Sequence, residues 1–389
     1  MAYIKVNQQN VKSKKEAIEI CPFNAIESQN DKIVINSACK MCKICINQMP
    51  EIYEFVEGKK IILNKDEWKG IVVYVDHVEG NIHPVTYELI GKAKQLAKKI
   101  NHPVYCLFIG SDIREKADDL LHYGVDEVFV YDEKELYDFR IEPYTAVFED
   151  FINNVKPTII LVGGTTIGRS LAPRVAARFR TGLTADCTIL DVKENTDLDQ
   201  IRPAFGGNIM AHIHTPKHRP QFSTVRYKIF DAPEKNENKS GKITVCEIKK
   251  NKLKSVIKVL EIKKKDKVKS IEEAEIIVVA GNGVRQESDL ILIQKLADKL
   301  GGMVATTRPL IEAGWTDAKN QIGLSGRTVK PKLIITCGVS GSIQFVAGMN
   351  NSENIFAINS DPNAQIFKVA NYGIVGDLYE ILPELIDSL

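Results

Sequence analysis

The sequence lacks the features that mark membrane, secreted and nucleic-acid-binding proteins. It has no run of about eighteen apolar residues, the length that a membrane-spanning helix needs. Its first residues, MAYIKVNQQN, contain no apolar stretch of the kind found in signal peptides. Its 52 lysine and arginine residues nearly balance its 50 aspartate and glutamate residues, which leaves no large basic field for nucleic acid. We therefore expect a cytoplasmic protein with neither a membrane nor a nucleic acid as partner.

The sequence also lacks the cysteine pattern of a disulfide-stapled protein. Four of its eight cysteines are single and mostly lie in apolar, strand-like sequence, at positions 106, 187, 246 and 337. Such cysteines are typical of small core residues in a reducing compartment. A chain of 389 residues is long enough to form two or three domains with cores of their own.

The remaining four cysteines are the most informative feature of the chain. Cys39, Cys42 and Cys45 have the spacing C-x2-C-x2-C, and Cys21 is followed by Pro22. In ferredoxins, this spacing supplies three ligands of an iron–sulfur cluster, and a remote Cys-Pro pair supplies the fourth. The pattern therefore predicts one [4Fe–4S] cluster with Cys21, Cys39, Cys42 and Cys45 as its ligands.

A second cluster, as in two-cluster ferredoxins, is not expected. The four positions where its cysteines would stand are occupied by Val11, Lys14, Ala17 and Met49. Two other uses of the cysteines compete with the cluster. A zinc site usually takes its ligands from two separated pairs, so three cysteines on one tight loop fit it poorly. A disulfide is disfavoured because nothing marks the chain as secreted.

The pattern of the chain changes three times. Residues 1–66, with short strands on each side of the cysteines, are expected to form a ferredoxin-like α+β domain. Residues 67–230 alternate short apolar strands with amphipathic helices, which predicts a parallel sheet covered on both faces. Residues 231–270 are rich in lysine and keep two strand-like stretches, so we expect a linker or hinge there. Residues 271–389 return to the alternation of strands and helices and predict a second α/β domain.

Small polar segments follow the expected strands of the last domain. They include Gly281-Asn282-Gly283 and residues 306–308, 321–326, 338–342 and 359–361. In open parallel sheets, ligands bind beyond the carboxyl ends of the strands, where glycine lets backbone N–H groups approach a pyrophosphate. The first segment alone is a weak signal, because a tight turn explains it equally well. Together the segments predict a dinucleotide site, without a choice between flavin and nicotinamide.

Three stretches of the sequence are similar to a known family. Residues 165–187, 202–211 and 321–378 resemble the α subunit of electron-transfer flavoproteins, and the likeness extends over about residues 70–389. A ferredoxin-like extension precedes a subset of this family. The resemblance implies two Rossmann-like α/β domains, of which the first meets a β subunit and the second binds FAD. Residues 163–170, which could be read as a phosphate loop or a structural turn, would then face the β subunit.

The resemblance also implies which residues bind FAD. Residues 340–344 match the loop that holds the pyrophosphate and ribityl chain, Arg308 matches an arginine over the isoalloxazine ring, and residues 322–325 match the loop beneath it. The full set expected to bind FAD is Asn282, Arg285, Thr307, Arg308, Gln321, Ile322, Gly323, Leu324, Ser325, Ser340, Gly341, Ser342, Ile343, Gln344, Phe345, Asn359, Asp377 and Leu378. The last three of these match the adenosine end of the site.

Three positions depart from the pattern of that family. Phe345 replaces a histidine on the pyrimidine side of the flavin, and Leu324 replaces a glutamine. Asn282 replaces an arginine near the phosphates, although Arg285 is close enough in sequence to substitute for it. Losing the histidine removes a hydrogen-bond donor to the anionic reduced flavin, so we expect an altered flavin potential and retained FAD binding.

Three histidines could indicate a further metal site. His212 and His214 alternate along an expected strand and so share one face, and His218 follows. Because no cysteine or carboxylate cluster lies nearby in the sequence, we do not expect a metal there.

The resemblance implies a function in electron transfer. We expect the α subunit of a heterodimeric electron-transfer flavoprotein, which carries electrons through FAD and the cluster between NADH or ferredoxin and a partner flavin dehydrogenase. That dehydrogenase would act on an acyl-CoA or on lactate, and the process would be flavin-based electron bifurcation. No side chain is expected to perform acid–base or nucleophilic catalysis, since the cofactors carry the chemistry. A self-sufficient flavoprotein oxidoreductase and a non-redox nucleotide-binding scaffold are the alternatives.

Overall fold

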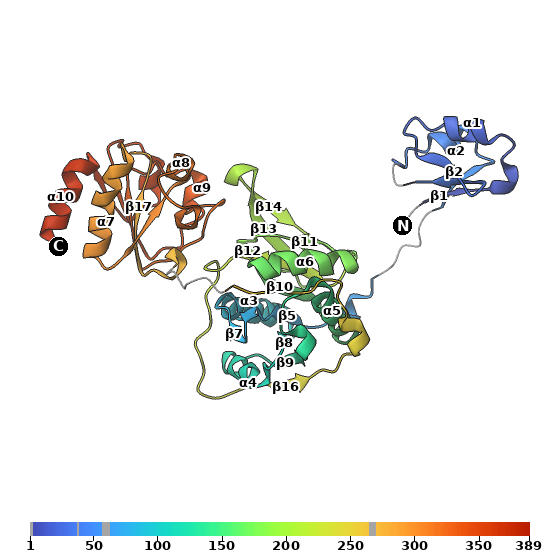
Figure 1. Ribbon diagram of the computed structural model, residues 1–389, viewed down its shortest axis with the longest axis horizontal. Coiled ribbons are helices and arrows are strands. Elements are labelled where there is room, and N and C mark those ends of the chain that lie inside the picture. The colour runs from blue at the N-terminus through green and yellow to red at the C-terminus, as the bar shows by residue number, and fades with distance from the viewer. Residues whose placement is uncertain (1–2, 37–38, 57–62, 264–269) are drawn as a thin grey trace. The chain divides into compact units, whose positions relative to one another are not determined.

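A computed structural model divides the chain into two units, Met1–Leu63 and Asn64–Leu389. The residues that the structure describes are 3–36, 39–56, 63–263 and 270–389. Figure 1 colours the N-terminal unit dark blue and the larger unit from light blue to red. Among the described residues, no helix is both long and apolar enough to cross a membrane.

In the described part of the N-terminal unit, two antiparallel strand pairs and two short helices form a small α+β fold. β1 (Tyr3–Val6) pairs with β4 (Tyr53–Val56), and β2 (Ile26–Gln29) pairs with β3 (Lys32–Ile35). The helices are α1 (Lys14–Glu19) and α2 (Ile44–Gln48). Each of these six elements contributes a buried side chain to one shared core. This core is small, so the unit has little apolar burial with which to stabilise itself.

The larger unit begins with a seven-stranded parallel sheet within residues 64–263. Its strand order is β11–β15–β10–β5–β8–β9–β16. In chain order these strands are β5 (Ile71–Tyr74), β8 (Val104–Gly110), β9 (Glu127–Asp132), β10 (Ile159–Gly163), β11 (Leu183–Thr184), β15 (Gln221–Val225) and β16 (Lys242–Val245). The order reverses at β5, between β10 and β8, and such a switch point is where open parallel sheets bind ligands.

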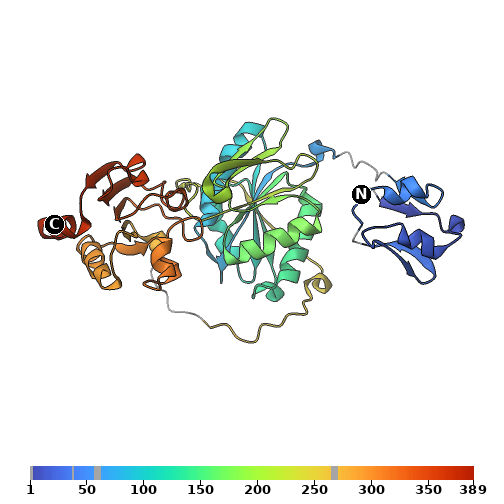
Figure 2. The same ribbon diagram turned by 90° about the horizontal axis from the view of Figure 1, so that it is seen from above.

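Helices cover both faces of this sheet, as Figure 2 shows. One core contains buried residues of α3 (Val85–Ile100), and the other contains those of α5 (Ile141–Val155) and α6 (Thr166–Arg178). The short helix α4 (Arg114–Ala117) contributes to the first core. Successive residues of the buried strands alternate between the two cores because strand side chains point to opposite faces. The parallel α/β architecture expected from the sequence is therefore confirmed.

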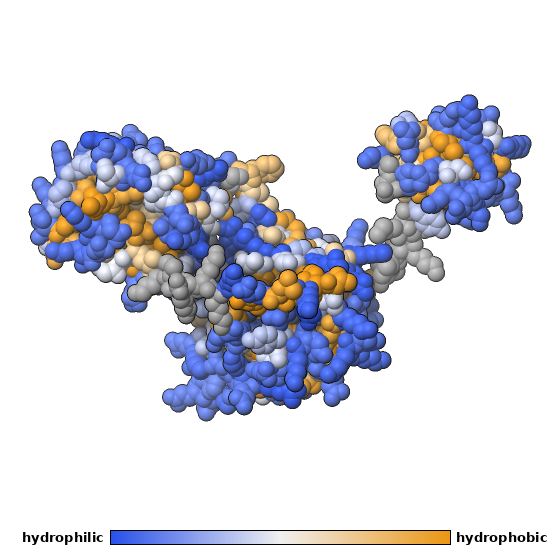
Figure 3. Space-filling model, in the orientation of Figure 1, coloured by the Kyte–Doolittle hydropathy of each residue, from blue (hydrophilic) through white to orange (hydrophobic). Residues whose placement is uncertain are grey.

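A three-stranded antiparallel sheet and a small hairpin are inserted into this domain. The sheet consists of β12 (Ile189–Val192), β13 (Leu198–Ala204) and β14 (Ile209–Ile213), and β6 (His77–Val78) pairs with β7 (Asn81–Ile82) in the hairpin. The tip between β13 and β14 carries Phe205, whose side chain is 82% exposed. Figure 3 shows hydrophobic atoms at this tip.

The segment expected to be a linker is partly built into the sheet. β16 pairs in parallel with β9 and forms an edge of the seven-stranded sheet, so residues 242–245 belong to the first α/β domain. The second strand-like stretch, residues 256–259, is not a strand, and Val256 is almost fully exposed. Residues 254–263 have no regular secondary structure. Residues 231–270 therefore include an edge strand of the first α/β domain.

The described residues from 270 to 389 form a second parallel sheet of five strands. Its order is β18–β17–β19–β20–β21, with β17 (Ile276–Ala280), β18 (Met303–Thr306), β19 (Leu333–Cys337), β20 (Asn354–Asn359) and β21 (Tyr372–Val375). The helices are α7 (Leu290–Lys299), α8 (Arg308–Glu312), α9 (Ile343–Val346) and α10 (Leu378–Ser388). α7 and α10 pack on one face, and α9 lies in the core on the other. The order reverses at β17, which again marks a ligand-binding edge.

Candidate functional site

The residues expected to bind FAD gather at one edge of the five-stranded sheet. They follow the carboxyl ends of all five strands, from Asn282 after β17 to Asp377 after β21. Because these strands are parallel, their carboxyl ends meet at the same edge. The structure therefore brings together segments that are up to about a hundred residues apart in the sequence.

The loop Gln321–Arg327, here called the flavin loop, is fixed to two of these strand ends. Its Ile322 amide donates to the Thr306 carbonyl at the end of β18, at 3.1 Å. Its Leu324 amide donates to the Gln344 carbonyl after β19, at 2.9 Å. Within the loop, Nε2 of Gln321 donates to Oγ of Ser325 at 2.7 Å. The bond to Gln344 joins the flavin loop to residues 340–344, the loop expected to hold the pyrophosphate.

Two glycines allow the backbone of these loops to approach closely. Gly341 has φ +82°, and a β-carbon there would overlap the backbone nitrogen of Ile366. Gly323 has φ +138°, and a β-carbon there would lie 2.9 Å from the Gln344 carbonyl oxygen. Both positions thus require glycine for conformation and for space. Nearby Ser340 and Ser342 are exposed, so their hydroxyls are accessible to a ligand at this edge.

Thr307 provides a direct test of whether a ligand fits the edge. The residue is only 8% exposed, and its amide donates to the Ala280 carbonyl at 3.1 Å. Its Oγ1 atom is buried and has no hydrogen-bond partner among the described residues. A buried hydroxyl without a partner is costly unless a bound group completes it. The position fits a polar flavin atom, as the resemblance implies.

The two expected arginines are exposed and are held by carboxylates of the same domain. Nη2 of Arg285 lies 2.8 Å from Oδ2 of Asp377, and its guanidinium stacks on the Tyr379 ring at 4.4 Å. Nε of Arg308 lies 2.8 Å from Oε1 of Glu312, one turn along α8. Arg285 and Asp377 therefore form one unit at the adenosine end, although they stand 92 positions apart.

Several of the expected residues face inward or serve the loops themselves, and Ile322 and Leu378 are buried in the two cores of the domain. Phe345 is buried in the core beside Val329 and Met349, so its ring fills the interior of the domain. Asn359 uses both ends of its amide within the protein: Nδ2 donates to the Val339 carbonyl at 2.7 Å, and Oδ1 accepts from the Asp361 amide at 2.9 Å. Asn359 therefore shapes the pyrophosphate side of the edge through its neighbours.

The four cysteines of the N-terminal unit line one small pocket. Cys45 is buried, Cys21 and Cys39 are half-buried, and Cys42 is exposed. The loop that carries three of them contains two non-glycine residues with positive φ, Met41 at 56° and Lys43 at 64°. Such backbone turns bring cysteines three positions apart toward a common space.

Backbone N–H groups point at the cysteine sulfurs. The Ala25 amide donates to Sγ of Cys21 and the Met41 amide to Sγ of Cys39, both at 3.4 Å. Burial raises the pKa of the Cys45 thiol, which the nearby Cys39, Cys42 and Cys21 thiols raise further. Four neighbouring thiols, two of which accept a backbone N–H, fit the chemistry of the iron–sulfur cluster expected from the sequence.

Among the described residues, no group of three or more His, Cys, Asp or Glu side chains converges on a single metal ion. In a cubane cluster each thiolate binds a different iron, so the sulfurs surround a volume instead of a point. The four cysteines fit such a group. His212 and His214 have another explanation, because both lie 3.0 Å from a carboxylate oxygen of Asp199 on the neighbouring strand. Sequence reasoning missed Asp199, which is close only in the folded sheet.

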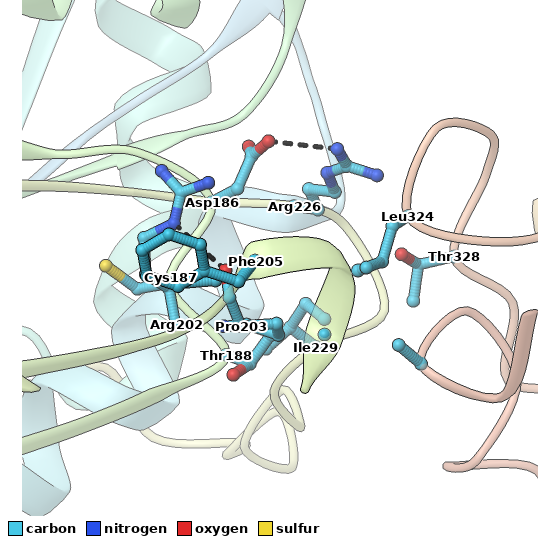
Figure 4. Close-up of a pocket in the computed structure, with 13 residues that line it drawn as sticks. Asp186, Cys187, Thr188, Arg202, Pro203, Phe205, Arg226, Ile229, Leu324 and Thr328 are labelled. Atoms are coloured by element: carbon cyan, nitrogen blue, oxygen red, sulfur yellow. Dashed lines mark hydrogen bonds and ion pairs between the residues drawn. The ribbon is translucent and has the colours of Figure 1, made fainter. Parts of the chain in front are cut away.

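A hollow lies where the first α/β domain meets the flavin loop (Figure 4). Its walls include Asp186, Arg202, Phe205 and Arg226 from the first domain and Leu324 from the loop. Nη2 of Arg226 lies 2.9 Å from Oδ2 of Asp186. Burial alone would raise the pKa of Asp186, but the hydrogen bond from Arg226 and the neighbouring guanidinium charges outweigh it and lower the pKa. Sequence reasoning also missed this hollow.

Comparison with known families agrees with this geometry. The family model described as "Electron transfer flavoprotein domain" matches residues 71–251. The model described as "Electron transfer flavoprotein FAD-binding domain" matches residues 270–350. The two matches together cover more than half of the chain. The chain belongs to the electron transfer flavoprotein family.

Individual relatives of this electron transfer flavoprotein agree with the family assignment. The lactate dehydrogenase (NAD(+),ferredoxin) subunit LctC of Acetobacterium woodii is 61% identical over 100% of this chain and 94% of its own length. The electron transfer flavoprotein subunit alpha of Thermoanaerobacterium thermosaccharolyticum is 43% identical over 83% of this chain and 98% of its own length. The acryloyl-CoA reductase electron transfer subunit beta of Anaerotignum propionicum is 37% identical over 83% and 96%. The chain is thus an α-type subunit with an electron-transfer role, and its FAD-binding domain is the five-stranded one.

Proposed function

We propose that this chain is the α subunit of a bifurcating electron transfer flavoprotein that serves a lactate dehydrogenase in the cytoplasm. It would bind FAD and one [4Fe–4S] cluster and would pair with a β subunit. The observation that carries the proposal is the coexistence, in one chain, of an electron transfer flavoprotein FAD domain and a four-cysteine cavity with the ferredoxin ligand spacing.

The FAD would lie at the carboxyl edge of the five-stranded sheet. When bound there, FAD accepts and donates electrons either singly or in pairs. The backbone around Gly341 would receive the pyrophosphate, and the Thr307 hydroxyl would complete its hydrogen bonding on the flavin. The Arg308 guanidinium would favour extra negative charge on the ring by charge alone. Because phenylalanine has no hydrogen-bond donor, and Phe345 is buried in the core, this chain would lack the usual side-chain donor to the pyrimidine side.

The cluster would be held by Cys21, Cys39, Cys42 and Cys45. Bound there, it supplies a one-electron relay. The Ala25 and Met41 amides, which donate to two of the sulfurs, would stabilise negative charge on them and so favour the reduced state. Ferredoxin is the proposed partner of this N-terminal ferredoxin-like domain, because the exposed Cys42 leaves one ligand near the surface.

Two dehydrogenase partners are suggested by the relatives, and the lactate type is favoured. The relative named for lactate dehydrogenase is 61% identical and covers all of this chain, including the cysteines. The relative named for acryloyl-CoA reductase is 37% identical and covers 83%. We therefore infer that the chain passes electrons between lactate dehydrogenase, a nicotinamide and ferredoxin, and that an acyl-CoA enzyme is the less favoured partner.

The test is reconstitution of the α chain, its β subunit and the dehydrogenase without oxygen. Lactate and NAD⁺ should yield little NADH alone, and adding reduced ferredoxin should start NADH formation. The dehydrogenase should reduce an artificial dye with lactate in both cases, which shows that the complex is intact. NADH formation that does not depend on ferredoxin, in a complex that passes the dye test, would contradict bifurcation.

A further inference from the structure

Arg226 connects the seven-stranded sheet to the flavin loop. It follows β15 directly, at the carboxyl end of that strand. Its Nη2 group lies 2.9 Å from Oδ2 of Asp186, and its Nη1 group donates to the Gly326 carbonyl at 3.2 Å. Figure 4 shows the guanidinium between Asp186 and the flavin-loop side of the hollow. One side chain of the first α/β domain thus bonds the backbone of the second.

The Asp186 carboxylate fixes the orientation of Arg226. The Asp186 amide donates to Oγ1 of Thr224 in β15 at 3.1 Å, so the carboxylate is tied to the strand that carries the arginine. Its other oxygen lies 3.0 Å from Nη2 of Arg169. A carboxylate held between two guanidinium groups stays ionised, and a charge-assisted pair of this kind has a defined direction. Arg226 therefore extends toward the flavin loop with little freedom.

Arg169 provides a natural contrast to Arg226. Both guanidinium groups pair with the same carboxylate, at nearly the same distance. Only Arg226 also has a bond to the flavin loop. A change caused by losing the shared ion pair should therefore appear when either arginine is replaced. A change in the flavin loop should appear only when Arg226 is replaced.

The flavin loop can transmit this contact to the flavin edge. The Gly326 amide donates to the Gly323 carbonyl at 3.0 Å, and the Arg327 amide donates to the Gln321 carbonyl at 2.8 Å. These bonds close the loop into a compact turn, so a contact at Gly326 fixes the position of Ser325 beside it. The β13–β14 tip also lies against the FAD domain: Gly207 is so near Ile343 that an added β-carbon would be 2.7 Å from that side chain.

We propose that Arg226 is a positioning residue that seats the flavin loop on the carboxyl end of the seven-stranded sheet. Arg226 does so by bridging Asp186 and the Gly326 carbonyl. The inference deepens the proposed function, since it rests on the loop being the one beneath the flavin ring. Breaking the bridge should free the FAD domain to leave the first domain more often, and the loop amides should then be exposed to solvent.

The test is hydrogen exchange of the flavin-loop peptide, residues 321–328, in the complete α–β complex. Arg226→Gln should speed exchange of this peptide by about tenfold, because a hydrogen bond from a charged donor contributes about one decade in an equilibrium. The matched control Arg169→Gln removes a partner of the same carboxylate. Where size-exclusion chromatography shows that the β subunit is still bound, exchange of that peptide should be unchanged in this control. Equal effects of the two variants, or no effect of Arg226→Gln, would overturn the proposal.

Two further variants keep the test decisive if Arg226→Gln does not fold. Arg226→Lys retains the charge but lacks the planar guanidinium that reaches both partners, so the exchange rate of the flavin-loop peptide should rise by an intermediate amount. Asp186→Asn should loosen the loop by removing the group that aims Arg226. FAD content and iron content, measured on the same samples, report on the proposed function separately. Normal cofactor content with unchanged exchange in all three variants would reject the seating role and leave the proposed function intact.

Discussion

The two candidate redox sites are built from different chemical groups. The cysteine site depends on four side chains, three of them on one short loop, and each would make a separate bond to the cluster. The expected FAD site depends on the ends of five strands and on backbone groups of the loops between them. The cysteine site should therefore lose its cluster when any one of the four cysteines is replaced. The expected FAD site should fail when the backbone is displaced and should tolerate most single side-chain losses.

The largest effect is expected at the cysteine site. Cys42→Ser replaces one thiolate ligand with a poorer one, and iron should fall well below about four atoms per chain, because the cluster would be held by only three thiolates. FAD content should not change, since the FAD domain belongs to the other unit. Iron analysis and visible spectra of the protein purified without oxygen measure both quantities.

Cys246→Ser is the matched control for that prediction. Cys246 is half-buried like Cys21, but it lies next to β16 and away from the cavity that the four cysteines line. The variant should keep its full iron content. Full iron in Cys42→Ser, or loss of iron in Cys246→Ser, would show that the ligand assignment is wrong.

The second-largest effect is expected at the FAD site, from a substitution that displaces its backbone. Gly341→Ala adds a β-carbon that overlaps the Ile366 backbone, at a position with positive φ. We expect a loss of about 2–5 kcal/mol in stability and most of the bound FAD, from strain and overpacking together. Denaturant unfolding and flavin content measure these two losses.

Gly301→Ala separates strain from overlap. Gly301 has φ +68° with nothing within 4 Å of its β-carbon position, so only the conformational cost of about 1–2 kcal/mol should remain. FAD content should stay normal in this variant. If Gly341→Ala proved as mild as Gly301→Ala, the close backbone approach would not be a requirement of the site.

The folding stability of the first α/β domain should itself depend on pH, and this must be known before the two sites are compared at different pH values. Glu88 of α3 is 6% exposed, and burial raises its pKa from 4.5 to about 8 despite the hydrogen bonds from the Lys228 amide. The folded state therefore holds this proton more tightly than the unfolded state between about pH 4.5 and 8. The stability that the neutral carboxyl contributes is complete below that window and is lost as the pH rises through it.

Glu88→Gln tests this sign directly. Wild-type stability should fall by up to about 1.4 kcal/mol per pH unit across the window because of this one group, and the variant should lack that slope. Urea unfolding at several pH values measures it. A slope that survives in Glu88→Gln would mean that another group controls the pH dependence.

The smallest effect concerns one side chain of the FAD site. Thr307→Val removes the buried hydroxyl that has no partner among the described residues. FAD affinity should fall by about tenfold, the loss of one hydrogen bond, while the stability of the flavin-free protein should stay the same or rise. Flavin titration and thermal unfolding of the flavin-free form measure the two quantities. A drop in flavin-free stability would show that the hydroxyl serves the fold and not a ligand.

The sequence indicated that the four cysteines lie close together, which the structure shows, more directly than it indicated the surroundings of the expected FAD site, because three of the cysteines are neighbours in the chain. Three ligands stand within seven positions, and their spacing fixes which side chains can share a cavity. The edge of the five-stranded sheet could also be predicted, because polar segments at the ends of parallel strands must meet there. The inward position of Phe345 could not, since nothing in the local pattern indicates which face of a short helix is buried.

Arg226 was missed because the strand before it does not look buried. β15 contains Gln221, Ser223 and Thr224, yet all of its residues are buried. Two of its polar side chains bond to β13 of the three-stranded sheet: Oε1 of Gln221 accepts from the Leu198 amide, and Oγ of Ser223 donates to Gln200, both at 2.9 Å. Oγ1 of Thr224 accepts from the Asp186 amide. Hydrogen-bonded polar groups can be buried at little cost, and hydrophobic periodicity cannot detect them.

The most direct test of the account is the cofactor content of the α chain purified without oxygen together with its β subunit. We expect about four iron and four sulfide per α chain, together with FAD that the Gly341→Ala variant no longer retains. Iron near zero or near eight, or FAD that survives in the Gly341→Ala variant, would contradict the claim that one chain carries these two differently built redox sites.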